Sequence, residues 1–187
     1  MPEDREHSDG DALDHTLIAQ WRGGDERAAT VLVERHATAL ARYVSSLGEQ
    51  DAVEEVVQDT FVRAFSSLDS FRGESALRTW LFTIARRLVL DRRRAARRRR
   101  DVATLDDVSG GAASEYTALD SIIAEEAEQR VREAVERLSP TQKEVFTLRV
   151  SEGLSYKEIA EIVGTTEGAA RVHYHNALRT VKESLYV

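Results

Sequence analysis

The sequence predicts an all-α protein of two small helical domains joined by an acidic flexible linker, with a helix-turn-helix as the C-terminal domain. Apolar residues recur at helical spacing through most of the 187 residues, and only two prolines interrupt the chain. Serine followed three residues later by Gln or Glu opens two of the later helices. We expect a disordered acidic N-terminus at 1–11, a first domain at 12–100, a linker at 101–125 and a second domain at 126–187.

The composition excludes several kinds of site. The chain has no cysteine, so disulfides, thiol chemistry and cysteine-ligated metals are all unavailable. Neither His7 nor His15 has a partner at metal-ligand spacing, and His36 falls in an apolar stripe as a core residue, so we expect no metal and no cofactor. The N-terminus MPEDREHSDGD lacks the basic and then apolar pattern of a signal peptide, and no apolar run approaches the roughly 18 residues of a membrane span. We therefore expect a soluble, cytoplasmic protein.

Two scaffold helices are expected first, over Leu13–Trp21, ended by Gly23 and Gly24, and over Glu26–Leu47, ended by Gly48. The apolar stripe of the second comprises Ala29, Leu32, Val33, His36, Leu40 and Val44.

A third helix is expected from Asp51, which forms a capping pair with Glu54, to Leu68. Its expected buried stripe is Val53, Val57, Thr60, Phe61, Ala64 and Leu68. Its outward face carries Glu55, Gln58, Asp59, Val62 and Ser66. An exposed valine among acids occurs both on protein-binding helices and on ordinary surfaces, and the residues alone favour the ordinary surface.

A long helix with a basic end follows Phe71. Its expected buried face is Leu77, Trp80, Leu81, Ile84, Ala85 and Leu88, while Thr79, Thr83 and Arg86 lie opposite. Seven of the nine residues in Arg92–Arg100 are arginine. Such a block is suited to an acidic partner, most commonly phosphate, because guanidinium groups bind it bidentately. A solvated helix end that complements the helix dipole is the alternative.

The order DAVEEVVQDTFVRAFSSLDSFRGES, then LRTWLFTIARRLVLDRRR, resembles the promoter-melting domain of bacterial sigma factors of the sigma-70 family, in the extracytoplasmic-function group. The resemblance implies that the acidic helix face binds the clamp of core RNA polymerase, through Glu55, Gln58, Asp59 and Val62. It implies that the loop Phe71, Arg72, Gly73, Glu74 and Ser75 holds an unpaired base of the −10 element. It implies that the next helix contacts the same strand through Thr79, Thr83, Arg86 and Arg87, where the family commonly has asparagine at the position of Arg87.

The chemistry of this loop agrees with base binding. Phe71 can offer a π-face, Arg72 a cation and Gly73 exposed backbone donors, and base–aromatic stacking contributes roughly 1–3 kcal/mol. In the alternative interpretation, Phe71 is a core residue and Ser75 is the N-cap of the following helix.

Residues 101–125 break the helical pattern at Ser109, Gly110 and Gly111 and are interpreted as a linker. The resemblance implies that this linker passes through polymerase toward the active-site cleft and the RNA exit path, with acids at Asp101, Asp106, Asp107 and Glu115. A solvated acidic tether is the alternative.

The second domain is expected to begin with a helix over Ile122–Leu138. Capping patterns then open helices over Thr141–Ser151 and Tyr156–Val163, at Ser139 with Gln142 and at Ser155 with Glu158. Gly164 ends the second of these, and Thr165 or Thr166 caps the final helix. Two helices joined by a short turn containing glycine form a helix-turn-helix.

The final helix is expected to bury Ala170, Tyr174, Ala177, Leu178, Val181 and Leu185. Its outward and flanking residues are Arg171, Val172, His173, His175, Asn176, Arg179 and Lys182. Asn can pair with adenine, Arg with guanine or phosphate, and Val with a thymine methyl, so this surface can read a major groove. The stretch LSPTQKEVFTLRVSEGLSYKEIAEIVGTTEGAARVHYHNALRTV resembles the −35-binding domain of the same sigma factors.

We therefore expect a sigma factor without catalytic activity that binds bacterial core RNA polymerase and directs it to promoter DNA. The resemblance also implies an anti-sigma protein or another inhibitory regulator as a partner. The competing interpretations are an autonomous helix-turn-helix DNA-binding regulator and an acidic helical adaptor whose arginine run meets another protein.

Overall fold

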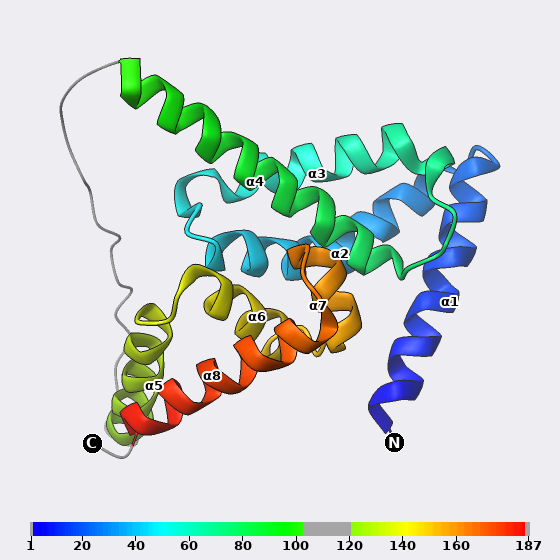
Figure 1. Ribbon diagram of the computed structural model, residues 1–187. Coiled ribbons are helices and arrows are strands. Elements are labelled where there is room, and N and C mark those ends of the chain that lie inside the picture. The colour runs from blue at the N-terminus through cyan, green and yellow to red at the C-terminus, as the bar shows by residue number, and fades with distance from the viewer. Residues whose placement is uncertain (1, 103–120, 186–187) are drawn as a thin grey trace. The chain divides into compact units, whose positions relative to one another are not determined.

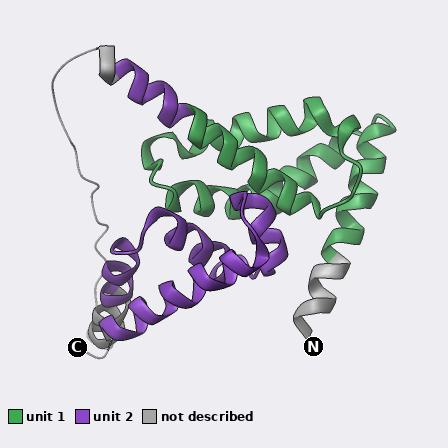
Figure 2. Ribbon diagram, in the orientation of Figure 1, with its two compact units in different colours: residues 1–91 green, residues 92–187 purple. Residues whose placement is uncertain are grey.

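A computed structural model describes residues 2–102 and 121–185 of the chain (Figure 1). All the regular elements in these two ranges are helices. The chain divides into two compact units, residues 1–91 and residues 92–187 (Figure 2). The two-part all-α architecture predicted from the sequence is confirmed, while the central part of the expected linker lies outside the described residues.

Unit 1 is built on four α-helices, the last of which continues beyond its boundary: α1 (Pro2–Arg22), α2 (Glu26–Ser46), α3 (Val53–Ser67) and α4 (Leu77–Val102). Short 3-10 turns, η1 (Gln50–Ala52) and η2 (Leu68–Ser70), flank α3. Helix α1 packs on α2, and α2 packs on α3. Aromatic contacts join two further pairs, with Trp21 of α1 against Phe65 of α3 and Tyr43 of α2 edge-on to Phe82 of α4.

Helix α1 extends further toward the N-terminus than the sequence pattern predicted. It begins at Pro2, whereas residues 1–11 were expected to be disordered. Leu17 and Ile18 are buried and hold the helix against the rest of unit 1. Adding turns to an existing helix needs no new nucleus, so the polar residues before Leu13 can continue it.

Helix α2 follows its predicted bounds closely. Asp25 caps its N-terminus, with its carboxylate accepting a hydrogen bond from the backbone N–H of Arg27. Its buried residues include Ala28 and Tyr43, whereas the predicted Ala29 and Val33 are half-buried. The buried residues and the predicted ones lie on the same side of α2, and the centre of the buried face is shifted by one position from the predicted one.

Helix α3 differs from its prediction at its start. Residues Gln50–Ala52 form a 3-10 turn, and the N-cap of α3 is Ala52, which makes no side-chain cap hydrogen bond. The predicted capping role of Asp51 is therefore wrong. Val56 is buried, and Val53 and Val57 are only half-buried.

The buried face of α4 is turned toward Phe82 and Val89 relative to the predicted stripe. Those two residues are 1% and 0% exposed, while the predicted Trp80 and Ile84 are half-buried. The segment is apolar around much of its circumference, so periodicity alone did not fix the centre of the face. Thr79 is 0% exposed, and its predicted outward position is wrong.

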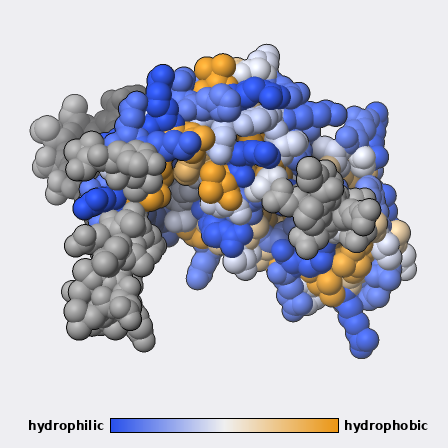
Figure 3. Space-filling model, turned by 90° about the horizontal axis from the view of Figure 1, so that it is seen from below, coloured by the Kyte–Doolittle hydropathy of each residue, from blue (hydrophilic) through white to orange (hydrophobic). Residues whose placement is uncertain are grey.

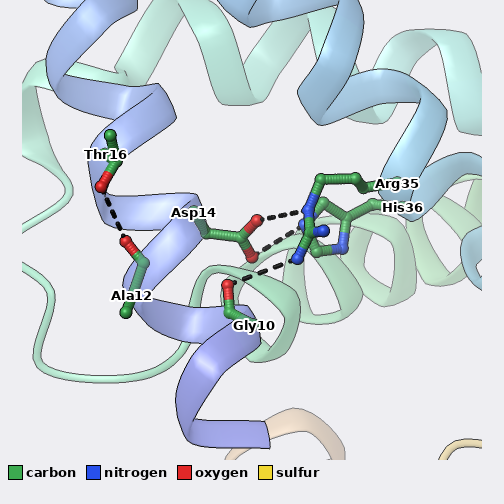
Figure 4. Close-up of polar contacts among 6 residues, drawn as sticks. All are labelled: Gly10, Ala12, Asp14, Thr16, Arg35 and His36. Atoms are coloured by element: carbon green, nitrogen blue, oxygen red, sulfur yellow. Dashed lines mark hydrogen bonds and ion pairs between the residues drawn. The ribbon is translucent and has the colours of Figure 1, made fainter. Parts of the chain in front are cut away.

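A buried polar cluster joins α1 to α2. Nε of Arg35 donates to Oδ1 of Asp14 at 2.9 Å, and Nε2 of His36 lies 2.9 Å from Oδ2 of the same carboxylate (Figure 4). Arg35 also donates to the backbone oxygen of Gly10. Asp14 and His36 are buried, so His36 is the packed core histidine that the sequence predicted, with a carboxylate as its partner.

Burial alone would raise the pKa of Asp14. The hydrogen bonds and positive charges of His36 and Arg35 outweigh that effect and hold the pKa of the Asp14 carboxyl below its usual value. The cluster is therefore strongest with Asp14 ionised.

Unit 2 contains, within the described residues, the end of α4 and four further helices: α5 (Ser121–Glu136), α6 (Pro140–Val150), α7 (Tyr156–Val163) and α8 (Glu167–Leu185). Both predicted capping boxes are present, at Ser139 with Gln142 and at Ser155 with Glu158. The hydroxyl of Thr166 accepts from the backbone N–H of Ala169, which confirms Thr166 as the cap of α8.

Helix α8 packs against α5, α6 and α7. Its small residues Ala170 and Ala177 are 0% exposed, so neighbouring helices can approach it closely. Ala177 and Val181 form a cluster with Ala134 and Leu138, with Phe146 packed at its edge. This packing fixes which side of α8 remains exposed.

Candidate functional site

The acidic face of α3 presents four residues in one row. Glu55, Gln58, Asp59 and Val62 follow the spacing i, i+3, i+4, i+7, which places them on one side of a helix, and all four are exposed. Val62 has 58% of its surface exposed. On the opposite side Val56, Thr60 and Ala64 are buried, so the core fixes the direction of this row. The predicted grouping is present, and its binding role stays a prediction.

The loop between α3 and α4 presents mainly polar and backbone groups. Arg72, Gly73 and Glu74 are exposed and Ser75 is half-buried. The ring of Phe71 is 8% exposed, and its centroid lies 5.0 Å from that of Trp80. The prediction that Phe71 offers an open face to a base does not fit this geometry, because the ring completes the core.

In the alternative interpretation of this loop, Ser75 is the N-cap of α4. The backbone N–H of Trp80 donates to the backbone oxygen of Ala76, so the first hydrogen-bonded turn of α4 begins one residue after Ser75. Ala76 therefore occupies the N-cap position of α4, and the alternative in which Ser75 is the N-cap is wrong.

An arginine from α1, absent from the sequence prediction, holds the start of this loop. Nη2 of Arg22 donates to the backbone oxygens of Leu68 at 2.6 Å and Phe71 at 3.1 Å, and Nε lies 3.9 Å from the carboxylate of Asp69. Carbonyl groups at the end of α3 and its 3-10 turn thereby gain a donor. No local pattern could have indicated Arg22, because its partners lie 46 and 49 positions away.

The outward side of α4 carries three of its four predicted DNA-binding residues. Thr83 and Arg86 are half-buried and Arg87 is exposed. The hydroxyl of Thr83 donates to the backbone oxygen of Thr79 at 2.9 Å. The arginine block continues the same helix, with Arg97, Arg98 and Arg99 exposed.

The turn between α7 and α8 has the geometry that its sequence predicted. Gly164 has φ +73°, in the left-handed region that favours glycine, and its N–H donates to the backbone oxygen of Ala160. The N–H of Thr165 donates to the same oxygen. The chain therefore leaves α7 in a tight turn and enters α8 after Thr166, which forms the predicted helix-turn-helix.

The candidate reading face of α8 is exposed where the prediction placed it. Arg171, Val172, His175 and Arg179 are exposed, and Val172 has 58% of its surface exposed. His173 and Asn176 are half-buried. A guanidinium, an amide and a branched apolar group thus occur together on one helix, and these are groups that distinguish base edges.

Tyr156 supports this face and was not predicted as a site residue. The guanidinium carbon of Arg171 lies 4.8 Å from the centroid of the Tyr156 ring, and that of Arg149 lies 5.1 Å from it. Nη2 of Arg171 also donates to Glu167 at 3.0 Å. The ring of Tyr156 packs edge-on to Tyr174. Arg171 therefore has an aromatic and a carboxylate neighbour within its own unit.

Other kinds of site are not seen in the part of the chain that the structure describes. Among these residues no group of three or more His, Cys, Asp or Glu could hold a metal ion. In the two described ranges, no helix combines the length and the apolar composition that a membrane span requires. On the face drawn in Figure 3, apolar residues lie in small patches between hydrophilic ones.

Two protein families match the chain. Residues 32–99 match Sigma-70 region 2, and residues 128–181 match Sigma-70, region 4. The first match covers α3, the loop and all but the last residue of the arginine block, and the second covers α6, α7 and α8 as far as Val181.

Curated relatives match nearly the whole chain. The ECF RNA polymerase sigma-E factor of Escherichia coli strain K12 is 34% identical over 175 residues, which cover 90% of this chain and 92% of that protein. The ECF RNA polymerase sigma-E factor of Haemophilus influenzae is 31% identical over 179 residues, which cover 92% and 95%.

Solved structures agree with these matches. The sigma factor RpoE in complex with the anti-sigma factor NepR from Bartonella quintana is 28% identical, with a TM-score of 0.68 over 84% of this chain and 96% of that one. CnrH in complex with the cytosolic domain of CnrY is 28% identical, with a TM-score of 0.65 over 92% and 97%. With both sigma regions matched and relatives above 30% identity over nine-tenths of its length, the chain belongs to the ECF group of RNA polymerase sigma factors in the non-catalytic sigma-70 family.

Proposed function

We propose that this sigma factor binds core RNA polymerase through the exposed row of α3, recognises and melts the −10 element with unit 1, and reads the −35 element with α8. The observation that carries the proposal is the agreement between family and geometry. Each of the two matched regions contains an exposed surface of the expected chemistry, on a helix or loop whose other side is buried. Its place of action is then the cytoplasm, where promoter DNA lies.

The row of α3 supports protein binding rather than DNA binding. Glu55 and Asp59 carry negative charge, which repels the phosphate backbone, and Val62 adds an exposed apolar contact at the end of the row. The exposed arginines toward the end of α4 have the opposite charge and suit nucleic acid. Two surfaces of opposite charge match a factor that joins a protein to DNA.

The residues proposed for the −10 strand are Arg72, Gly73, Glu74, Ser75, Thr83, Arg86 and Arg87. Arg72 and Arg87 are exposed and can pair with phosphate or with a base edge. For the −35 element, Arg171, Val172, His173, His175, Asn176 and Arg179 form the proposed reading face. Phe71 and Thr79 act from the core, by fixing the loop and the start of α4.

We infer an anti-sigma protein as a further partner. Two solved relatives with the same fold are seen with partner proteins, one of them named as an anti-sigma factor. A partner that covers the row of α3 would prevent polymerase binding by occupying the same residues.

Co-migration with bacterial core RNA polymerase tests the proposal. The wild-type protein is expected to co-migrate, and Asp59→Lys is expected to weaken the complex at least tenfold, because it reverses a charge inside the row. Glu34→Lys is the matched control, since Glu34 is an exposed acid in the middle of α2, outside the row. Its complex is expected to equal that of the wild type.

Two outcomes would contradict the proposal in different ways. Failure of the wild-type protein to bind polymerase at micromolar concentration and moderate salt would contradict polymerase binding itself. Equal weakening by Asp59→Lys and Glu34→Lys would show that total charge, and not the row on α3, governs the complex.

A further inference from the structure

The loop proposed to hold an unpaired base has no exposed aromatic ring of its own. Phe71 is the single aromatic residue of 71–75, and its ring is 8% exposed. Base-binding loops commonly use a flat side chain, since every base has a π-face on which such a group can stack. An exposed aromatic residue of α1, however, contacts Phe71.

His15 of α1 lies directly against this loop. Its ring centroid is 6.4 Å from that of Phe71, with 30° between the planes, and Phe71 in turn packs on Trp80. Phe71 is buried between the half-buried Trp80 and the exposed His15, so His15 is the most exposed of the three residues. In Figure 1 the segment between α3 and α4 runs beside α1.

The backbone of the loop is shaped to admit this ring. Gly73 has φ +72°, and a Cβ added to it would lie 2.9 Å from Cε1 of His15. Such a separation is too short for real atoms, so a larger residue at position 73 would displace the His15 ring, and the positive φ itself favours glycine there. Gly73 itself is exposed, so the ring and the loop backbone share one surface.

Arg22 fixes the same helix to the same loop. Its two hydrogen bonds to the backbone oxygens of Leu68 and Phe71 join α1 to the residues immediately before Arg72. His15 and Arg22 are seven positions apart and therefore lie on one side of α1, two turns from each other. The position of the His15 ring relative to the loop is thus held by the helix and not only by its own contacts.

We infer that His15 is a DNA-facing residue of the −10 loop, whose exposed ring supplies the stacking surface for the unpaired base. The inference rests on the proposed function of unit 1 and names a residue for it. Arg72 then supplies a cation beside the base and Gly73 gives the backbone room to approach. Arg22 is a positioning residue, because it touches the loop and not the base.

The test compares His15→Leu with His15→Phe in the holoenzyme formed with core polymerase. A pool of randomised single-stranded DNA 12-mers is first selected with the wild-type holoenzyme, and the enriched sequence is then used as a fluorescent probe. Loss of the ring in His15→Leu is expected to weaken binding of this probe roughly tenfold, within the range of base–aromatic stacking. His15→Phe keeps a flat ring and is expected to stay within twofold of the wild type.

Abasic probes separate a ring–base contact from general damage. The wild type and His15→Leu are expected to bind equally to a probe that lacks the stacked base. With probes that are abasic at other positions, the tenfold difference between the two proteins is expected to remain. Gln20→Leu, at an exposed position elsewhere on α1, serves as the matched control and is expected to bind as the wild type does. Tryptophan fluorescence checks folding, because both tryptophans, Trp21 and Trp80, belong to unit 1.

Three outcomes overturn the inference. Binding by His15→Leu equal to that of the wild type would show that the ring is not used. The same loss with every abasic probe would give His15 a structural role only. A wild-type holoenzyme that enriches no sequence from the pool would overturn the proposed −10 function together with the inference, which distinguishes that failure from the other two.

Discussion

The −10 loop of unit 1 and the helix-turn-helix of unit 2 are both proposed DNA contacts, but different kinds of contact fix them. The loop is held by Arg22, whose backbone partners Leu68 and Phe71 lie 46 and 49 positions away. In the helix-turn-helix the starts of α7 and α8 are set by sequence neighbours, such as Ser155 with Glu158 and Thr166 with Ala169. A site fixed by distant residues can be altered by a substitution far away in the sequence. Geometry fixed by sequence neighbours is altered mainly by substitutions among those neighbours.

The same contrast extends to the polar contacts that stabilise each unit. In unit 1 the Asp14 carboxylate is buried between α1 and α2, where it binds Arg35 and His36. In unit 2 the capping boxes lie at exposed helix starts. A buried charge that loses its partners costs far more than a lost cap at the surface, so the two units should differ in sensitivity.

The largest effect is expected from Asp14→Ala. It leaves Nε of Arg35 and Nε2 of His36 without their buried carboxylate partner, which should lower the free energy of unfolding of unit 1 by about 3 kcal/mol. Denaturant unfolding followed by tryptophan fluorescence measures this, since Trp21 and Trp80 both report on unit 1. Glu34→Ala is the control, because Glu34 is an exposed residue of the same helix as Arg35. It should change the denaturant midpoint of unfolding little.

The pH dependence of this effect has a definite sign. Because the pKa of Asp14 is lowered in the folded state, its contribution to stability is complete above the ordinary value of 3.8 and declines as pH falls through the lowered value. The difference between wild type and Asp14→Ala should therefore shrink in acid. A difference that stayed constant from neutral pH to pH 2 would show that the ionised carboxylate is not the source of the stability.

Local residues were sufficient to predict the helix ends of unit 2, but not its contact between Tyr156 and Arg171 or the loop contacts of unit 1. The capping serines, Gly164 and the exposed positions of α8 follow from residues within four places of one another. Predictions for Phe71 and Thr79 failed because the apolar circumference of α4 and the packing of α1 decide which side faces inward. The sequence also gave no sign of the ring contact between His15 and Phe71, which joins residues that only the tertiary fold brings together.

A smaller effect is expected from Ser155→Ala. The Ser155 hydroxyl accepts from the backbone N–H of Glu158, so its loss should lower the stability of α7 by about 1 kcal/mol. Amide hydrogen exchange across α7 and α8 should quicken about fivefold while the tryptophan signal of unit 1 stays unchanged. Ser151→Ala, at an exposed serine after α6, is the matched control.

If Ser155→Ala moved the tryptophan midpoint as far as Asp14→Ala, the two units would unfold together. The contrast between local and distant stabilisation would then not be measurable in the intact chain.

The smallest effect is expected from Tyr156→Leu, on DNA affinity. Exposed cation–π contacts contribute about 0.5–1 kcal/mol, so removing the ring beside Arg171 should weaken binding of the holoenzyme to its −35 duplex about two- to fivefold. Tyr156→Phe keeps the ring and should bind as the wild type does, which separates the ring from the hydroxyl. If both variants bound equally weakly, the hydroxyl would be the functional group. If neither weakened binding, the ion pair with Glu167 would suffice to place Arg171, and the reading face of α8 would be fixed by that helix alone.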